Sequence, residues 1–272
     1  MIPTIIFIIL FFVLWGDLIA AEPLVRGTAA KVANWTARFR YRDYLAVIVL
    51  LLVGGAVAAV AGDEFLDLSE LVVANNSGLH KFDSMTHDWA VRERNSGSTA
   101  FFAFMTTAGG PVVMGLLTGI IAGALFVRKR PRWAVYLLVT AGGGALLNME
   151  LKRFYERARP ALAEMLRRAH GYSFPSGHAM GATVVLGALA YLVVRTQRTW
   201  RQKSAVIAAA VTVILAVASS RIYLGVHWVS DVVAGITCGC LWLATTTIGY
   251  ETFRRIRLIR AIRMKRGATT SF

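Results

Sequence analysis

Long apolar runs separated by short polar segments dominate the pattern of this chain of 272 residues. Six of these runs are near the ~20 residues that a helix needs to cross a bilayer, at a rise of about 1.5 Å per residue. The apolar positions are continuous rather than alternating or confined to one face, which is typical of membrane spans and not of soluble domains. The runs are Tyr44 to Ala61, Ala100 to Val127, Trp133 to Leu151, His178 to Val194, Ser204 to Ser219 and Trp228 to Tyr250.

A further apolar run, Ile2 to Ala20, lies before the first of these spans. No basic residue precedes it and no clear small-residue cleavage site follows it, so it is not typical of a signal peptide that is removed. We predict a seventh, N-terminal helix, with an interfacial or re-entrant segment as the alternative because Gly16 and Asp17 interrupt its end. The expected fold class is therefore all-α: a polytopic transmembrane helical bundle with a six-helix core and one N-terminal hydrophobic helix.

The basic residues between the runs predict the orientation of the bundle. One set of alternate loops, together with the C-terminal tail, carries twenty of the 30 Lys and Arg residues. By the positive-inside rule these loops are cytoplasmic, and the opposite ends of the spans face the periplasm or the cell exterior. The predicted domain organisation is an N-terminal hydrophobic helix with a basic cytoplasmic linker (1–43), a six-span core (44–250) and a basic cytoplasmic tail (251–272).

Two further patterns concern the core itself. Residues 65–98 are too polar to cross a bilayer, yet apolar side chains recur among their charges. This favours short amphipathic helices at the membrane interface, in the position of a lid. Glycines recur every four residues at Gly115, Gly119 and Gly123, and again at 142–144. We expect these small faces to let neighbouring helices pack closely.

The composition indicates which class of partner the protein binds. The chain is 56% hydrophobic, 17% charged and has a formal net charge of +15, but its basic residues cluster at the ends of apolar runs. Aromatic-rich basic motifs are absent, so we expect the lipid bilayer and not a nucleic acid as the partner. Cys238 and Cys240 lie inside an apolar run, where we expect packing residues and neither a disulfide nor a metal site. No cofactor is expected.

Three polar clusters interrupt the apolar sequence at the ends of predicted spans. Hydrolysis of a phosphate ester through a covalent intermediate needs a nucleophile, an acid for the leaving group and fixed positive charge around the phosphate oxygens. The clusters hold a candidate for each requirement, and they lie on one predicted face of the membrane. They are Lys152 with Arg159-Pro160, then Pro175 to His178, then Ser220-Arg221 with His227 and Asp231.

Each side chain has a role that its chemistry suits. His227 is the candidate nucleophile, and Asp231 follows one helical turn later, where its carboxylate can hold the other ring nitrogen and stabilise a phosphohistidine. His178 opens a span after Pro175-Ser176-Gly177, so backbone N–H groups can cradle an anion while the imidazole protonates the leaving oxygen. The cationic clamp consists of Lys152, Arg159 and Arg221.

These residues resemble the signature of the phosphatidic acid phosphatase type 2 superfamily, which also includes the vanadium haloperoxidases. The signature is Lys, six residues, Arg-Pro; then Pro-Ser-Gly-His; then Ser-Arg, five residues, His, three residues, Asp. The chain matches it without departure at Lys152 to Pro160, Pro175 to His178 and Ser220 to Asp231. The resemblance covers about 100–250 and implies a metal-independent reaction in which His227 is phosphorylated and then hydrolysed. It also implies that Ser176 and Gly177 bind phosphate together with the three cations.

The function that we predict is an extracytoplasmic lipid phosphate phosphatase of the bacterial inner membrane. A substrate with its tail in the bilayer and its phosphate at the surface suits an active site near the interface. Undecaprenyl diphosphate is favoured, with phosphatidylglycerol phosphate, phosphatidic acid and lipid A phosphate close behind. A phosphotransferase using the same phosphohistidine is the alternative. The apolar spans disfavour a soluble haloperoxidase, and charges at span ends rather than at the midplane disfavour a transporter. The sequence predicts no oligomeric state.

Other polar residues belong to no signature. We expect Arg153 and Arg157 to be exposed or to face lipid phosphates, and we assign no role to Asn148 or Glu150. Arg167 and Arg168 suit a lipid headgroup, a second phosphate or plain solvation equally well. The remaining histidines are expected to be solvated: His80, His87 and His170.

Overall fold

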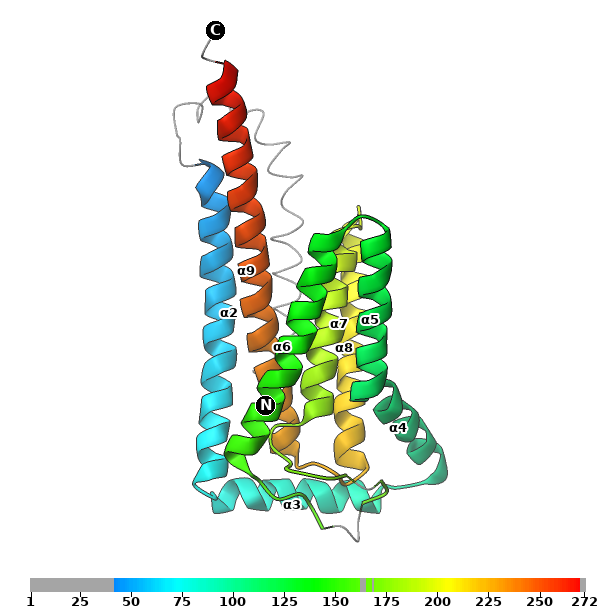
Figure 1. Cartoon of the computed structure of the whole chain (residues 1–272). Coiled ribbons are helices and arrows are strands. Elements are labelled where there is room, and N and C mark those ends of the chain that lie inside the picture. The colour runs from blue at the N-terminus through cyan, green and yellow to red at the C-terminus, as the bar shows by residue number, and fades with distance from the viewer. Residues whose placement is uncertain (1–41, 162–164, 168, 270–272) are drawn as a thin grey trace.

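The structure is a computed structural model, and it describes residues 42–161, 165–167 and 169–269. Over these residues it is entirely helical, with seven helices in a bundle and one, α3, lying across one end of it (Figure 1). The expected all-α fold class is therefore confirmed. The predicted N-terminal helix, Ile2 to Ala20, lies outside the described residues. The helices are α2 (Arg42–Val73), α3 (Ser77–Arg92), α4 (Ser96–Ala108), α5 (Pro111–Val127), α6 (Pro131–Tyr155), α7 (Gly177–Val194), α8 (Trp200–Tyr223) and α9 (Val229–Thr269).

Four of the described helices, α6 to α9, are long and apolar enough to cross a membrane, and α4 with α5 becomes a fifth span if the two count as one. α2, which carries the first predicted core span, packs along α9 (Figure 1). α9 continues without a break from the last predicted span into the basic tail. Its two cysteines, Cys238 and Cys240, are free and buried among core side chains, as expected of packing residues.

The single span predicted for Ala100 to Val127 is wrong in one respect, because α4 and α5 meet at a bend of 47°. Pro111 begins α5, where its fixed φ angle suits the first helical position and its missing N–H costs nothing. Gly109 makes the bend fit against α8, since a Cβ atom there would lie 2.3 Å from Val217 Cγ1. The bend turns α4 away from the direction of α5 (Figure 1), and the first turn of α4 packs on the end of α8, where Ser98 Oγ lies 2.7 Å from the Tyr223 hydroxyl.

α3 is an amphipathic helix within the segment 65–98, where short amphipathic helices were predicted, but residues 65–73 of that segment continue α2 instead. It begins after Asn76, whose side chain accepts a hydrogen bond from the Leu79 N–H at 3.0 Å and so satisfies one of the free N–H groups of the first turn. One face is buried against the bundle and the opposite face is exposed. The buried face holds Asp83, His87 and Ala90, whereas the exposed face holds Phe82, Met85 and Trp89. The expectation that His87 is solvated is therefore wrong.

The glycines divide into two groups. Gly143 and Gly144 permit close packing as predicted, since a Cβ at Gly143 would lie 2.3 Å from the Trp242 ring of α9. For Gly115, Gly119 and Gly123 of α5 the prediction is wrong, because a Cβ at any of them would meet nothing within 4 Å. Gly115 and Gly119 instead line a cavity that α6 also lines.

Candidate active site

The three polar clusters meet at the end of the bundle that α3 crosses. They come from the last turn of α6 and the loop after it, the start of α7, the end of α8 and the turn into α9. Tertiary packing thus gathers segments that are up to about eighty positions apart in sequence. Six of the eight predicted site residues line one cavity of about 960 Å³: Lys152, Arg159, Gly177, His178, Arg221 and His227.

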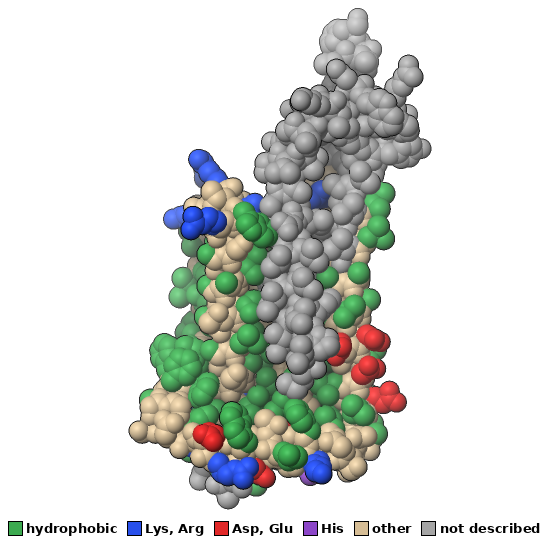
Figure 2. Space-filling model, turned by 180° about the vertical axis from the view of Figure 1, so that it is seen from behind, with side chains coloured by type: hydrophobic (Ala, Val, Ile, Leu, Met, Phe, Trp, Pro, Cys, Tyr) green, Lys and Arg blue, Asp and Glu red, His purple; other side chains and the backbone are tan. Residues whose placement is uncertain are grey.

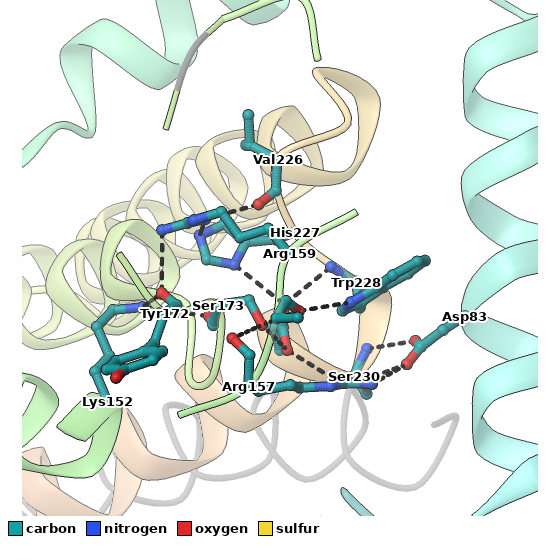
Figure 3. Close-up of polar contacts among 12 residues, drawn as sticks. Asp83, Lys152, Arg157, Arg159, Tyr172, Ser173, Val226, His227, Trp228 and Ser230 are labelled. Carbon is teal, nitrogen blue, oxygen red and sulfur yellow. Dashed lines mark hydrogen bonds and ion pairs between the residues drawn. The ribbon is translucent and has the colours of Figure 1, made fainter. Parts of the chain in front are cut away.

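His227 and Asp231 form a hydrogen-bonded pair at the start of α9. The imidazole Nδ1 lies 3.2 Å from Asp231 Oδ2, and Nε2 lies 3.1 Å from Arg159 Nη1 (Figure 3). A guanidinium group can only donate, so Nε2 accepts and Nδ1 carries the proton that is donated to the carboxylate. This tautomer leaves the Nε2 lone pair directed towards the arginine and the cavity.

The surroundings of His227 keep its imidazole neutral. The side chain is only 2% exposed. Burial first, and then the positive charges of Arg159, Arg221 and Lys152, hold the pKa of His227 well below its ordinary value of 6.5. A neutral imidazole retains the lone pair that a nucleophile requires.

The cations of the cavity are held in place by backbone carbonyls. Arg159 donates from Nη1 to the carbonyl of Val226 at 2.7 Å and from Nε to that of Gly171 at 2.9 Å. Lys152 Nζ donates to the carbonyl of Tyr172 at 2.7 Å (Figure 3). These bonds fix the loop between the first two motifs to the turn that carries His227. The cationic heads are therefore directed before any substrate binds.

Two buried donors lack partners. Arg221 donates from Nη1 to the hydroxyl of Thr106 on α4. Its Nε and the Ser176 hydroxyl are buried and have no hydrogen-bond partner within the described ranges. Buried polar groups are nearly always paired, so each needs an acceptor. Phosphate oxygens are acceptors of the charge and shape that such donors suit.

The start of α7 is held against α9. The Ser176 N–H donates to the backbone carbonyl of Asp231 at 2.8 Å. Gly235, one turn further along α9, makes the approach possible because a Cβ there would lie 2.6 Å from the Ser176 carbonyl. His178 follows in the first turn of α7, where N–H groups lack intrahelical partners and the helix end attracts anions. The site therefore combines a helix terminus with three cations.

Arg157 is not exposed, contrary to expectation. Its side chain is 14% exposed and forms ion pairs with Asp231 at 2.7 Å and with Asp83 of α3 at 2.8 Å (Figure 3). Arg153, one turn earlier, is exposed as expected and pairs with Glu150 at 2.8 Å. The sequence places the two arginines alike, and the fold separates them.

Further residues that no motif marked also reach the site. Asn148, Arg167 and His170 line the cavity. Arg167 Nη1 donates to the Thr107 hydroxyl at 2.9 Å, whereas Arg168 lies outside the described residues. No motif marked Asp83, which the structure buries on the face of α3 that also holds His87 and Ala90.

The donor set does not resemble a metal centre. Among the described side chains, no group of three or more His, Cys, Asp or Glu residues is placed to hold a metal ion. The cavity is instead lined by cationic and neutral groups, which suit an anion. A helical membrane bundle with a His–Asp pair in such a cavity defines the class of membrane enzymes that act on phosphate groups.

Comparison with known proteins specifies the family. Residues 132–255 match the PAP2 superfamily. The chain is 37% identical over 148 residues to phosphatidylglycerophosphatase B of Bacillus subtilis (strain 168), covering 53% of this chain and 71% of that protein. It also resembles the crystal structure of the first transmembrane PAP2 type phosphatidylglycerolphosphate phosphatase from Bacillus subtilis, with a TM-score of 0.65 and 31% identity over 70% of this chain and 94% of that one. The chain belongs to the PAP2 superfamily and is a membrane lipid phosphatase.

The depressed pKa of His227 is testable without turnover. Diethyl pyrocarbonate modifies only neutral imidazole, so the pH dependence of carbethoxylation at His227 reports its protonation. We expect a midpoint below 6.5, because burial and the neighbouring cations disfavour the imidazolium. Peptide mass spectrometry follows the modification, and the signal of His227 is the one that is absent from the His227→Ala protein. A midpoint at or above 6.5 would contradict the electrostatic description of the site.

Proposed function

We propose that the protein removes the terminal phosphate of phosphatidylglycerol phosphate, or of a closely similar lipid phosphate, through a phosphohistidine at His227. The observation that carries this proposal is that residues of all three motifs line one cavity. The two relatives from Bacillus subtilis are both named for phosphatidylglycerol phosphate, which favours this lipid. Undecaprenyl diphosphate, which was favoured on the sequence alone, has no comparable support and is tested in the assay as an alternative substrate.

The geometry suits a reaction in two steps. In the first, His227 Nε2 attacks phosphorus, the bond from phosphorus to the lipid oxygen breaks, and His178 gives that oxygen a proton. In the second, water attacks phosphorus and His178 takes a proton from the water. The bond between phosphorus and His227 Nε2 breaks, and inorganic phosphate leaves. Asp231 stabilises the positive imidazole ring in between. The cationic clamp balances the phosphate charge throughout.

A wall of the same cavity suits a lipid tail. Beyond the polar end, the cavity extends between α5 and α6, where Gly115 and Gly119 face Leu138, Ala141 and Gly142. No side chain of the described helices fills the space at Gly115 or Gly119. An acyl chain held there would keep its phosphate at the histidine pair. We infer that this groove, between α5 and α6, receives the tail of the substrate.

The chemistry is tested by phosphate release in detergent with a chelator. We expect wild type to release phosphate from phosphatidylglycerol phosphate faster than from undecaprenyl diphosphate or phosphatidic acid. His227→Ala should lose at least about 10³-fold in rate, because the nucleophile is removed. Lys81→Ala is the control, since Lys81 is exposed on α3 and lies outside the cavity, and it should keep the wild-type rate. Comparable activity in the His227→Ala and wild-type proteins would refute the phosphohistidine mechanism.

We further propose that the end with α3 faces outward from the bacterial inner membrane, because the described basic loops, between α5 and α6 and between α7 and α8, lie at the other end (Figure 1). Figure 2 shows Lys and Arg side chains gathered at that end. Ser77 begins α3, whereas Arg198 lies in the turn between α7 and α8 at the opposite end (Figure 1). In intact cells, a membrane-impermeant maleimide should label Ser77→Cys but reach Arg198→Cys only after permeabilisation. Both positions are exposed, and the natural cysteines are buried. The reverse labelling pattern would invert the proposed topology.

The tail groove is tested by filling it. Gly119→Leu should raise KM for a long-chain lipid phosphate about tenfold, because the new side chain occupies the space of the tail. A short-chain, soluble analogue should be hydrolysed at the wild-type rate. Gly123→Leu is the matched control: it lies one turn further along α5, also in open space, but does not line the cavity. Equal effects of both variants would exclude this groove as the tail site.

A further inference from the structure

A buried network of charges lies behind the His–Asp pair. Asp83 on α3 is 0% exposed. Its carboxylate accepts from Arg157 Nη2 at 2.8 Å, from the Ser230 N–H at 3.0 Å and from the Ser230 hydroxyl. A buried carboxylate is costly unless ionic and hydrogen-bonding partners surround it. Here the partners belong to the segments that carry the reacting groups.

Arg157 joins two carboxylates through one planar group. Nη2 contacts Asp83, while Nη1 contacts Asp231 Oδ1 at 2.7 Å and the Ser230 hydroxyl at 2.6 Å (Figure 3). The guanidinium fork holds fixed directions that a lysine ammonium cannot reproduce. The position of Asp83 is therefore transmitted through Arg157 to Asp231.

The two oxygens of Asp231 have different neighbours. Oδ1 faces Arg157, with the Ser173 hydroxyl further away at 3.5 Å. Oδ2 faces His227 Nδ1 at 3.2 Å and the Trp228 N–H at 3.0 Å. Rotation of the carboxylate would exchange these partners and lose the bond to the imidazole. Arg157 thus fixes which oxygen serves His227.

We propose that Asp83 and Arg157 are positioning residues for the His227–Asp231 pair, so that α3 is part of the catalytic apparatus. This inference rests on the proposed phosphohistidine mechanism. Neither residue occupies a position of the three motifs, and neither lines the cavity. Both act through Asp231: they set the orientation of its carboxylate and the share of its negative charge that reaches the imidazole.

Several other charged or titratable groups surround His227. Four groups face it from the cavity side: Lys152 of α6, Arg159 of the loop between α6 and α7, His178 of α7 and Arg221 of α8. On the α3 side, His80 and His87 lie against the neighbouring Trp228 ring, with centroids 5.9 and 5.7 Å away. Arg157 lies 6.0 Å from the centre of the same Trp228 ring, and its substitution removes none of these groups. A change in the pH at which His227 is protonated then reports the effect of Arg157 and Asp83 on Asp231.

Arg157→Gln is the decisive variant. Asp231 would keep its full negative charge towards His227, which favours the imidazolium, so the carbethoxylation midpoint of His227 should rise by about half to one pH unit. With the carboxylate free to rotate, kcat should fall about 10- to 100-fold while KM stays within about threefold, because the lost effect is on the reacting pair and not on substrate binding. Arg157→Lys should restore the midpoint and part of kcat.

The matched control is Arg153→Gln. It removes the same charge one turn earlier, from an exposed side chain, and should change neither the midpoint nor kcat. Asp83→Asn should lower kcat, and the double variant Asp83→Asn/Arg157→Gln should be no slower than Arg157→Gln alone, since both residues act through one carboxylate. If the losses of kcat in the two single variants add up in the double variant, Asp83 and Arg157 do not act through the same carboxylate.

A merely structural network would behave differently. It would lower thermal stability in detergent while the midpoint stays at the wild-type value, and that result overturns the proposal. If Arg157→Gln does not fold, Arg157→Lys and Asp83→Asn provide the same two readouts. Carbethoxylation requires no lipid, so absence of phosphate release by wild type would count against the proposed function alone. The carbethoxylation midpoint of His227 would still test whether Asp83 and Arg157 act on the His227–Asp231 pair.

Discussion

The active end of this protein depends on the burial of one carboxylate. Asp231 is 0% exposed, and removing an ionised group from water is costly unless donors surround it. Its side chain is met by Arg157, by the Trp228 N–H and by His227, and its backbone carbonyl by the N–H of Ser176. The donors come from three segments: the loop after α6, the start of α7 and the turn into α9. The contacts of this one residue therefore hold the segments of the three motifs together.

A second constraint is the excess of positive charge around that carboxylate. Lys152, Arg159 and Arg221 share one cavity, where their like charges repel one another because each side chain is at least partly withdrawn from water. Backbone carbonyls and hydroxyls hold the three heads in place. The same positive charges lower the pKa of His227 and favour an anion in the cavity. One arrangement of charge thus suits both the proposed nucleophile and the proposed phosphate site.

The fold was predictable where long local patterns decide it. Continuous apolar runs predicted the helical spans, and the mixed pattern of 65–98 predicted an amphipathic helix, because both signals depend on neighbouring residues alone. The bend at Gly109 was not predictable, since it depends on how closely Val217 of another helix approaches. For the same reason the glycines of α5 were misread. A small residue indicates that close packing is possible, not that a partner is present.

The sequence by itself determined the class of this protein, a membrane bundle of the PAP2 superfamily, and marked eight residues as the proposed site, because spacing within each motif is a property of the local chain. Only the tertiary structure decided which other groups support them. Arg153 and Arg157 look alike in sequence, yet one meets solvent and the other bridges Asp83 and Asp231. That difference arises from contacts between residues over seventy positions apart. A linear pattern carries no record of such distances, since they are set when α3 packs across the end of the bundle.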